Sequence, residues 1–131
     1  MRGGTTTQSP SKRRQITSGE TLVMMIKIYY FYKMKRGGAV YILTNKNKTT
    51  LYVDVTSNLK KRIFEHKQHI NLKSFTHKYN LVLLIYYEGF HNIEDAISIE
   101  KQIKAGSRKK KDALINSQNP DWNDLYQEIL D

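Results

Sequence analysis

Four side chains in this sequence have the types and the order needed for chemistry on a phosphate group: Tyr41, Tyr52, Arg62 and Glu100. A lone carboxylate commonly holds Mg²⁺, with water and substrate phosphate completing the coordination. An arginine fork matches two phosphate oxygens at once. A phenol acts as a hydrogen-bond relay, or as a phenolate where a cation lies beside it. Together these residue types are compatible with metal-assisted chemistry at a phosphate group.

Glu100 is the most informative of the four because it falls in the apolar stripe of an expected helix between Asn92 and Gly106. The other members of that stripe are Ile93, Ala96, Ile97 and Ile103. Burying an unpaired carboxylate is costly, so Glu100 must have a partner. A salt bridge to Lys104 or to Arg62 is the ordinary explanation, and a metal ion is the functional one.

Arg62 and His66 are four residues apart on an expected helix and therefore share one flank. Each also has an ordinary explanation, Arg62 as a surface residue of a basic run and His66 as a structural histidine. Tyr41 and Tyr52 are of a type common in strands. The histidines at 66, 69, 77 and 91 match no strong zinc spacing.

The residues that must position these side chains begin with a hairpin. Residues 40–45 and 49–55 are strand-like, and the N-K-N-K sequence between them is typical of a turn. Alternation along the second strand directs Leu51, Val53 and Val55 to a packed face. The opposite face is polar and carries Tyr52 and Asp54.

The remaining elements follow from caps and apolar patterns. Ser57 is an expected N-cap for a helix to about residue 67, with Leu59 and Ile63 on its apolar side. Residues 68–80 read as a loop and residues 81–90 as a central strand. Ser107 begins another helix, and Pro120 begins a short last one that covers the core with Trp122, Leu125, Tyr126 and Ile129. The pattern predicts a small α+β domain, a three-stranded antiparallel sheet flanked by helices.

Composition favours a polyanionic partner. The 131 residues carry a net charge of +10, from 22 Lys and Arg against 12 Asp and Glu. Nucleic acid is the simplest such partner and an anionic membrane surface is the alternative. The chain has no cysteine, which suits a cytoplasmic protein, and no apolar run approaches the ~20 residues of a membrane span.

The first 36 residues differ from the rest of the chain. Residues 1–20 are rich in Gly, Ser, Thr and basic groups, as in a disordered tail. Residues 21–34 are apolar and fit an extra strand, a helix or a partner-binding segment. A start of the natural protein at Met34 is a further interpretation. We therefore expect a tail over 1–36 and one domain over 37–130.

The spacing of these residues resembles the GIY-YIG nuclease superfamily, and most of all its short, stand-alone bacterial members. The resemblance rests on Ala39-Val40-Tyr41, Tyr52-Val53-Asp54, Arg62, His66 and Glu100, and on tracts such as YILTNKN, YYEGF and NPDW. It spans residues 37–130. It implies a three-stranded antiparallel sheet with flanking helices and an endonuclease that hydrolyses DNA phosphodiesters with one Mg²⁺ or Mn²⁺ ion.

By this resemblance, Glu100 holds the metal and Arg62 steadies the scissile phosphate. Tyr41 and Tyr52 position or deprotonate the attacking water, and His66 assists. Either Asn116 or Asn119 corresponds to a further asparagine of the family. The expected partner is nucleic acid, DNA more than RNA, in structure-selective repair or recombination. Candidates for contacts with its phosphate backbone are Lys60, Lys61, Lys67, Arg108, Lys109, Lys110 and Lys111, with plain solvation as the alternative.

Asp54 departs from the family pattern, which has glycine there. It projects on the same side of the strand as Tyr52, about 6.8 Å away. Its charge would repel a phosphate by roughly 2–3 kcal/mol at 6 Å. Asp54 therefore either weakens the enzyme or supplies a second metal ligand. The alternative functions are a nucleic-acid-binding module that has lost cleavage and a purely structural protein.

Overall fold

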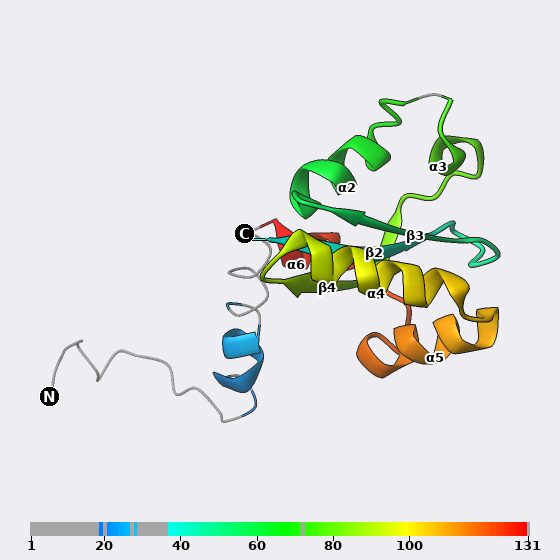
Figure 1. Cartoon of the computed structure of the whole chain (residues 1–131). Coiled ribbons are helices and arrows are strands. Elements are labelled where there is room, and N and C mark those ends of the chain that lie inside the picture. The colour runs from blue at the N-terminus through cyan, green and yellow to red at the C-terminus, as the bar shows by residue number, and fades with distance from the viewer. Residues whose placement is uncertain (1–18, 20, 27, 29–36, 72, 131) are drawn as a thin grey trace, which may run out of the picture.

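A three-stranded antiparallel sheet forms the centre of the protein (Figure 1). We describe a computed structural model in which residues 19, 21–26, 28, 37–71 and 73–130 are defined. The strands are β2 (Gly38–Thr44), β3 (Leu51–Thr56) and β4 (Leu83–Phe90), in the order β3-β2-β4. The α+β class and the three-stranded sheet predicted from the sequence are confirmed. The prediction of a central strand over residues 81–90 is wrong, because β2 pairs with both other strands and β4 lies at an edge.

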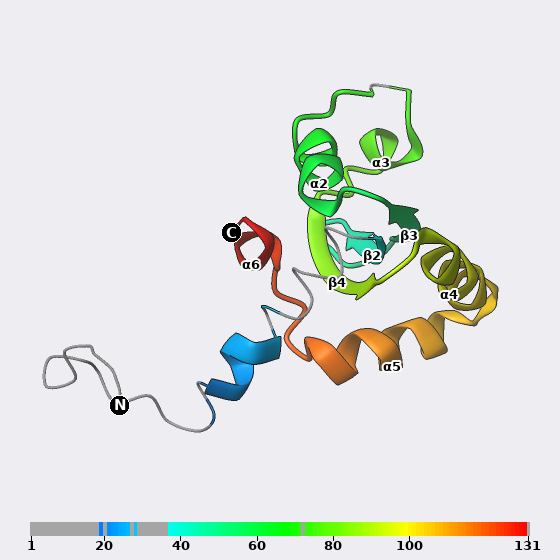
Figure 2. The ribbon, with the colours of Figure 1, turned by 60° about the vertical axis from the view of Figure 1, so that its left-hand side comes forward.

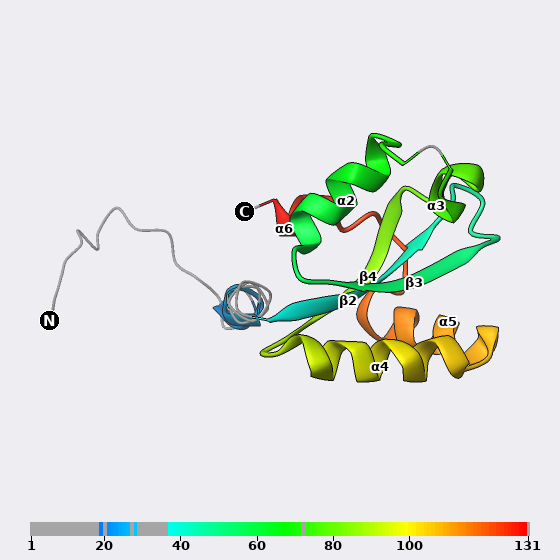
Figure 3. The ribbon, with the colours of Figure 1, turned by 45° about the horizontal axis from the view of Figure 1, so that its top comes forward.

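Helices cover both faces of the sheet (Figures 2 and 3). On one face lie α2 (Leu59–Lys67), α3 (Phe75–Lys78) and α6 (Tyr126–Ile129). On the other lie α4 (Ile93–Ala105) and α5 (Arg108–Gln118). Each face has its own apolar core. Burial of this apolar area is the main force that holds the helices against the sheet.

Alternation along β3 is as predicted, since Leu51, Val53 and Val55 all pack into the core beneath α4 and α5. The opposite face is not a fully exposed surface, however. Tyr52 packs there against the core on the α2 side, and Tyr52 and Asp54 are both half-buried. The polar face of β3 is therefore partly covered by the α2 side and partly reached by solvent.

The N-cap of α2 is Asn58, not Ser57 as predicted. The Asn58 side-chain oxygen accepts a hydrogen bond from the Lys61 backbone N–H at 3.1 Å. The Asn58 backbone carbonyl accepts one from the Arg62 backbone N–H at 3.0 Å. Strand β3 runs to Thr56, so the cap shifts by one residue. The other predicted caps are confirmed, with Asn92 before α4, Gly106 after it and Ser107 before α5.

Residues 68–80, predicted as a loop, contain the one-turn helix α3. Helix α2 ends just before it in a Schellman arrangement, in which Ile70 N–H bonds Glu65 C=O and His69 N–H bonds His66 C=O. His69 takes the left-handed φ of 53° that this ending requires. Ser74 then caps α3 by accepting the His77 N–H.

The last helix starts at Tyr126 rather than at Pro120. Trp122 has a φ of 54°, which interrupts any helix over the preceding residues. The Asn119 side chain holds this turn by accepting the Asn123 N–H and donating to its carbonyl. Leu125 and Ile129 still cover the core as predicted.

The described residues before the sheet, 19, 21–26 and 28, are helical and exposed. This agrees with one of the three alternatives for the apolar segment. The expected tail and the Met34 start fall largely outside the described residues. Within the described part of the chain, no helix has the length and apolar character needed to cross a membrane.

Candidate active site

Pairing of β2 with β3 brings the first two functional side chains together. Tyr41 lies opposite Asp54 in the antiparallel register. Tyr52 precedes Asp54 by two residues and therefore lies on the same face of β3. The rings of Tyr41 and Tyr52 are 6.4 Å apart between centroids. The hairpin thus places two phenols and one carboxylate on a single patch of the sheet.

Helix α2 crosses this patch and adds Arg62 and His66, one turn apart on the same flank. The Arg62 Nη1 lies 3.4 Å from Asp54 Oδ2. The His66 ring lies 5.8 Å from the Tyr41 ring and 5.9 Å from the Tyr52 ring. Four of the five residues predicted as catalytic or metal-binding therefore meet in one place.

Asp54 is the centre of this group. Its Oδ2 atom accepts the Tyr52 hydroxyl at 2.9 Å and the Tyr41 hydroxyl at 3.4 Å, in addition to Arg62. All three donors converge on one oxygen. The residue that departs from the family pattern is thus in direct contact with the residues that match it.

His66 links the phenols to the loop that carries α3. Its Nε2 atom is 3.0 Å from the Tyr41 hydroxyl, and its Nδ1 atom is 3.0 Å from the Thr76 hydroxyl. Thr76 in turn contacts the Ser74 hydroxyl at 3.0 Å. Which atom donates at His66 depends on its tautomer. The result is a continuous chain of exchangeable protons from Asp54 to Ser74.

The phenols are held in their neutral form. Burial, and then the charge of Asp54, raise the pKa of Tyr41 far above its ordinary value. Burial, followed by the hydrogen bond to Asp54 and its charge, raises the pKa of Tyr52 to about 12. The charge of Arg62 acts in the opposite direction on both pKa values but is outweighed. Both tyrosines are therefore hydrogen-bond donors at neutral pH.

The imidazole of His66 is also neutral at physiological pH. Burial, and then the nearby charge of Arg62, lower the pKa of His66 below its ordinary 6.5. Asp54 and Glu65 oppose this shift of the pKa without reversing it. A neutral imidazole has one nitrogen free to accept a proton, which the phenols lack at this pH.

Glu100 lies on α4, on the opposite face of the sheet from α2. It is buried, with 6% of its surface exposed, and its Oε2 atom pairs with Lys104 Nζ at 2.7 Å. The predicted salt bridge to Lys104 therefore exists. The charge of Glu100 also contributes to raising the pKa of Tyr52, which puts the carboxylate within electrostatic reach of that phenol.

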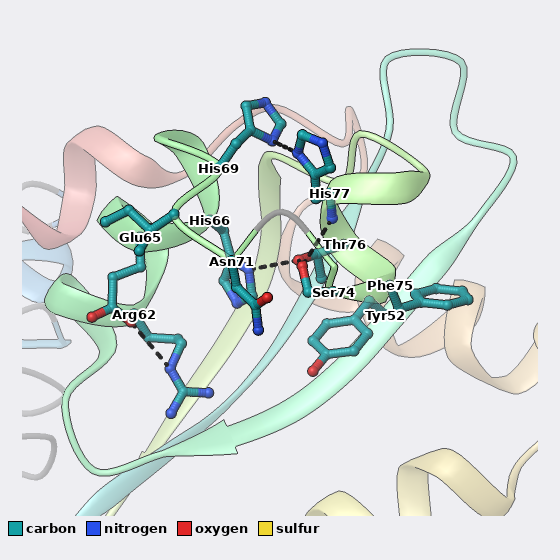
Figure 4. Close-up of a pocket in the computed structure, with 11 residues that line it drawn as sticks. Tyr52, Arg62, Glu65, His66, His69, Asn71, Ser74, Phe75, Thr76 and His77 are labelled. Carbon is teal, nitrogen blue, oxygen red and sulfur yellow. Dashed lines mark hydrogen bonds and ion pairs between the residues drawn. The ribbon is translucent and has the colours of Figure 1, made fainter.

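A pocket of about 280 Å³ adjoins these residues on the α3 side (Figure 4). Figure 4 shows the Tyr52 hydroxyl and the Arg62 guanidinium on one side of it and the His69–His77 pair on the other. The Nδ1 atoms of that pair are 3.0 Å apart. The lining residues are Tyr52, Arg62, Glu65, His66, His69, Ile70, Asn71, Ser74, Phe75, Thr76 and His77.

The two asparagine candidates have structural contacts. Asn119 is buried and donates to the Ile85 carbonyl of β4 at 3.0 Å. Asn116 is exposed and accepts the Trp122 indole N–H at 2.6 Å. Both therefore help to hold the turn after α5, and neither is hydrogen-bonded to Asp54, Tyr41, Tyr52 or Arg62.

The basic candidates divide into two sets. Lys67 binds Asp124 and the Val82 carbonyl, Arg108 binds Asp112 and two carbonyls of the β2–β3 turn, and Lys111 binds the Gly106 carbonyl. The side chains of Lys60, Lys61, Lys109 and Lys110 are exposed, and within residues 37–71 and 73–130 they have no hydrogen bond or ion pair. The second set is available to a polyanion.

Sequence reasoning missed Thr76 and Ser74, which hold His66, because residues 68–80 were expected to be an irregular loop. The signal was present in S-F-T-H, where a serine precedes a short helical turn as an N-cap. What could not be found was that this turn folds back onto His66.

Comparison of the sequence with known protein families identifies the family, over the region that contains the hairpin, α2 and α4. Residues 37–113, more than half of the chain, match the family model described as the GIY-YIG catalytic domain. This chain belongs to the GIY-YIG family. The resemblance inferred from Tyr41, Tyr52, Arg62 and Glu100 is thereby confirmed at the level of the family.

Relatives of this GIY-YIG protein include small bacterial proteins. UPF0213 protein CPE1444 of Clostridium perfringens (strain 13 / Type A) is 38% identical over 90 residues, which cover 69% of this chain and 95% of the relative. A UPF0213 protein in the ldhD 5'region of Pediococcus acidilactici is 43% identical over 63 residues, covering 47% of this chain and 64% of the relative. The solution NMR structure of UPF0213 protein BH0048 from Bacillus halodurans has a TM-score of 0.44 at 25% identity, covering 66% of this chain and 90% of that one.

Proposed function

We propose that this GIY-YIG protein is a metal-dependent endonuclease that hydrolyses phosphodiester bonds, in DNA more than in RNA. The observation that carries the proposal is the convergence of two phenols and a guanidinium from β2, β3 and α2 on one oxygen. Family membership and the net charge of +10 support a nucleic-acid substrate. A cytoplasmic role in repair or recombination is part of the same proposal.

Glu100 suits a single divalent cation such as Mg²⁺ or Mn²⁺. The described residues include no group of three or more His, Cys, Asp or Glu side chains that could enclose a metal. One buried carboxylate leaves the other positions to water and substrate phosphate, which is how Mg²⁺ is often bound. Lys104 is half-exposed and can release Glu100. The ion would supply Lewis acidity at a phosphate oxygen.

The role we assign to Arg62 is to bind the non-bridging phosphate oxygens. Its guanidinium stays charged, and its exposed part faces the pocket side of the site. Charge on these oxygens grows during in-line attack, so a fixed cation stabilises the transition state more than the ground state.

Tyr41 and Tyr52 act in this proposal as donors that orient, rather than as bases. Their raised pKa values make deprotonation at neutral pH costly. Neutral His66, 3.0 Å from the Tyr41 hydroxyl, takes up a proton relayed from the attacking water in the tautomer whose Nε2 atom is free, with Tyr41 then donating to His66 and not to Asp54. Thr76 fixes the imidazole in the orientation that this relay needs.

A nucleic-acid-binding module with weakened or lost cleavage is the second candidate function. The contacts of Asp54 favour it, because its carboxylate occupies the donors that a phosphate would use. The two functions differ in a single measurement, since only the first predicts strand cleavage.

Purified protein with Mg²⁺ or Mn²⁺ is expected to nick or cut DNA, and EDTA is expected to stop the reaction. The measurement is gel analysis of single-stranded, duplex and branched DNA of the same sequence, with an RNA copy for comparison. Binding without cleavage of every substrate in both metals would instead establish the second candidate function.

Affinity for nucleic acid is expected to fall steeply with salt, with Lys60 and Lys61 contributing. Each lysine that neutralises a phosphate contributes about one unit to the slope of log affinity against log salt. The double substitution Lys60→Ala/Lys61→Ala should therefore lower that slope by about two, measured by fluorescence anisotropy. The exposed Lys46 in the β2–β3 turn provides a control, Lys46→Ala. An unchanged slope in the double variant would leave these lysines as solvated surface residues.

A further inference from the structure

The contacts around Asp54 have the form of a ligand site that is already filled. Three donors from three elements, the Tyr41 and Tyr52 hydroxyls and the Arg62 Nη1, point at Oδ2. Two neutral hydroxyl donors and one cation around a single oxygen are what a phosphate or another oxyanion requires. Asp54 Oδ2 therefore stands in for one oxygen of such an anion.

Distances indicate that two of the three donors, Tyr41 and Arg62, are not fitted to this carboxylate, whereas the Tyr52 hydroxyl is 2.9 Å from it. Three ion pairs elsewhere in the described residues, Lys104–Glu100, Lys67–Asp124 and Arg108–Asp112, have N–O distances of 2.7–2.8 Å. Arg62 stays 3.4 Å from Asp54 and 3.8 Å from Glu65, so neither carboxylate engages its fork at full strength. The Tyr41 hydroxyl is also 3.4 Å away. A tetrahedral anion is larger than a carboxylate and can reach all three donors at once.

The site is also open to exchange. The side chains of Arg62 and Asp54 are 39% and 23% exposed, so an anion from solvent can reach them. The Arg62 and Tyr52 side chains line the adjoining pocket as well. An ion pair with this exposure contributes little to folding, so replacing one anion by another need not disturb the fold.

We propose that Asp54 is an internal occupant of an oxyanion site built by Tyr41, Tyr52 and Arg62, and that a phosphate group binds there only by displacing its carboxylate. The inference rests on the proposed function for the identity of the natural anion, a phosphodiester. The site itself is assigned by geometry and is tested with inorganic phosphate. Its consequence is that this chain holds its phosphate site in a self-blocked state.

The test compares phosphate binding by the parent and by Asp54→Ala, in metal-free buffer at constant ionic strength with chloride. We expect Asp54→Ala to bind inorganic phosphate at least about ten times more tightly, read by calorimetry and by the phosphate-dependent rise in melting temperature. Asp95→Ala removes an exposed carboxylate in the first turn of α4 and makes the same change in net charge. It should bind phosphate as the parent does.

Two more variants keep the test decisive. Asp54→Asn retains the size of the side chain and removes its charge, so it should gain phosphate affinity even if Asp54→Ala folds poorly. Adding Tyr52→Phe to either Asp54 variant should reduce the gain, because one donor is lost. Equal phosphate binding by the parent, both Asp54 variants and Asp95→Ala would overturn the proposal.

Cleavage gives a separate reading. Asp54→Gly is expected to cut DNA faster than the parent, by up to about a hundredfold. A slower Asp54→Gly would overturn the proposal and make Asp54 a working ligand or base. If neither the parent nor Asp54→Gly cuts DNA, yet Asp54→Ala gains phosphate affinity, the endonuclease is refuted and the self-blocked site stands. The two failures are therefore distinguishable.

Discussion

Glu100→Ala is expected to lower the rate of metal-dependent DNA cleavage by at least about a hundredfold while the protein stays folded. In the proposed mechanism Glu100 is the one protein ligand of the cation, and loss of a Lewis acid removes several kcal/mol of transition-state stabilisation. The fold should tolerate the change, because Lys104, its partner, is half-exposed and regains water. The measurement is initial cleavage rate against Mg²⁺ concentration, with melting temperature alongside.

Two further variants separate the carboxylate from its neighbourhood. Glu100→Gln keeps the shape and an oxygen that can accept from Lys104 but removes the charge, so it should be almost as inactive as the alanine variant. Glu94→Ala, an exposed carboxylate in the first turn of the same helix, should cut as the parent does. Parental activity in Glu100→Ala would remove the metal role from this residue and leave the Lys104 ion pair as its whole function.

Arg62→Ala is expected to reduce cleavage by about 10²–10³-fold, the range seen when one oriented donor to a developing oxyanion is removed. Arg62→Lys should recover only part of this, because an ammonium presents a point charge and not a two-pronged fork. Stability should change little, since the Arg62–Asp54 pair is long and 39% of the Arg62 side chain is exposed. Single-turnover rates with saturating enzyme isolate the chemical step.

The control for Arg62 is Lys46→Ala, which removes one exposed positive charge outside the site. If Arg62 acted only by attracting the polyanion, both variants would lose affinity in the same proportion and both would recover at low salt. The proposed role predicts a rate defect in Arg62→Ala that persists at low salt and at saturating enzyme. Full recovery under those conditions would reduce Arg62 to a surface charge.

Most of the architecture could be read from local patterns. The hairpin is encoded by alternation and turn residues on either side of residue 47, and α4 by Asn92, Gly106 and a regular apolar stripe. Errors occurred where tertiary contacts override local signals. The Asn119 side chain and the left-handed backbone conformation of Trp122 form a turn, so the last helix begins only at Tyr126. The fold of residues 68–80 depends on the Schellman ending of α2, which uses His69 where glycine is the usual choice.

The candidate site, like the fold, was predicted in part from local sequence patterns and depends in part on tertiary contacts. Residue types and spacing identified Tyr41, Tyr52, Arg62 and Glu100 and the family, and the position of Asp54 beside Tyr52 followed from the two-residue period of a strand. The sequence also indicated that Glu100 needs a partner, because a buried charge cannot stay unpaired. These conclusions need only local geometry.

Only the tertiary structure decided what Asp54 does. Its contact with Tyr41 depends on the register between β2 and β3, and its contact with Arg62 on how α2 lies across the sheet. Thr76 reaches His66 only because the chain folds back after α2. Register and helix placement are set by the packing of both cores as a whole, so no local stretch of sequence encodes them.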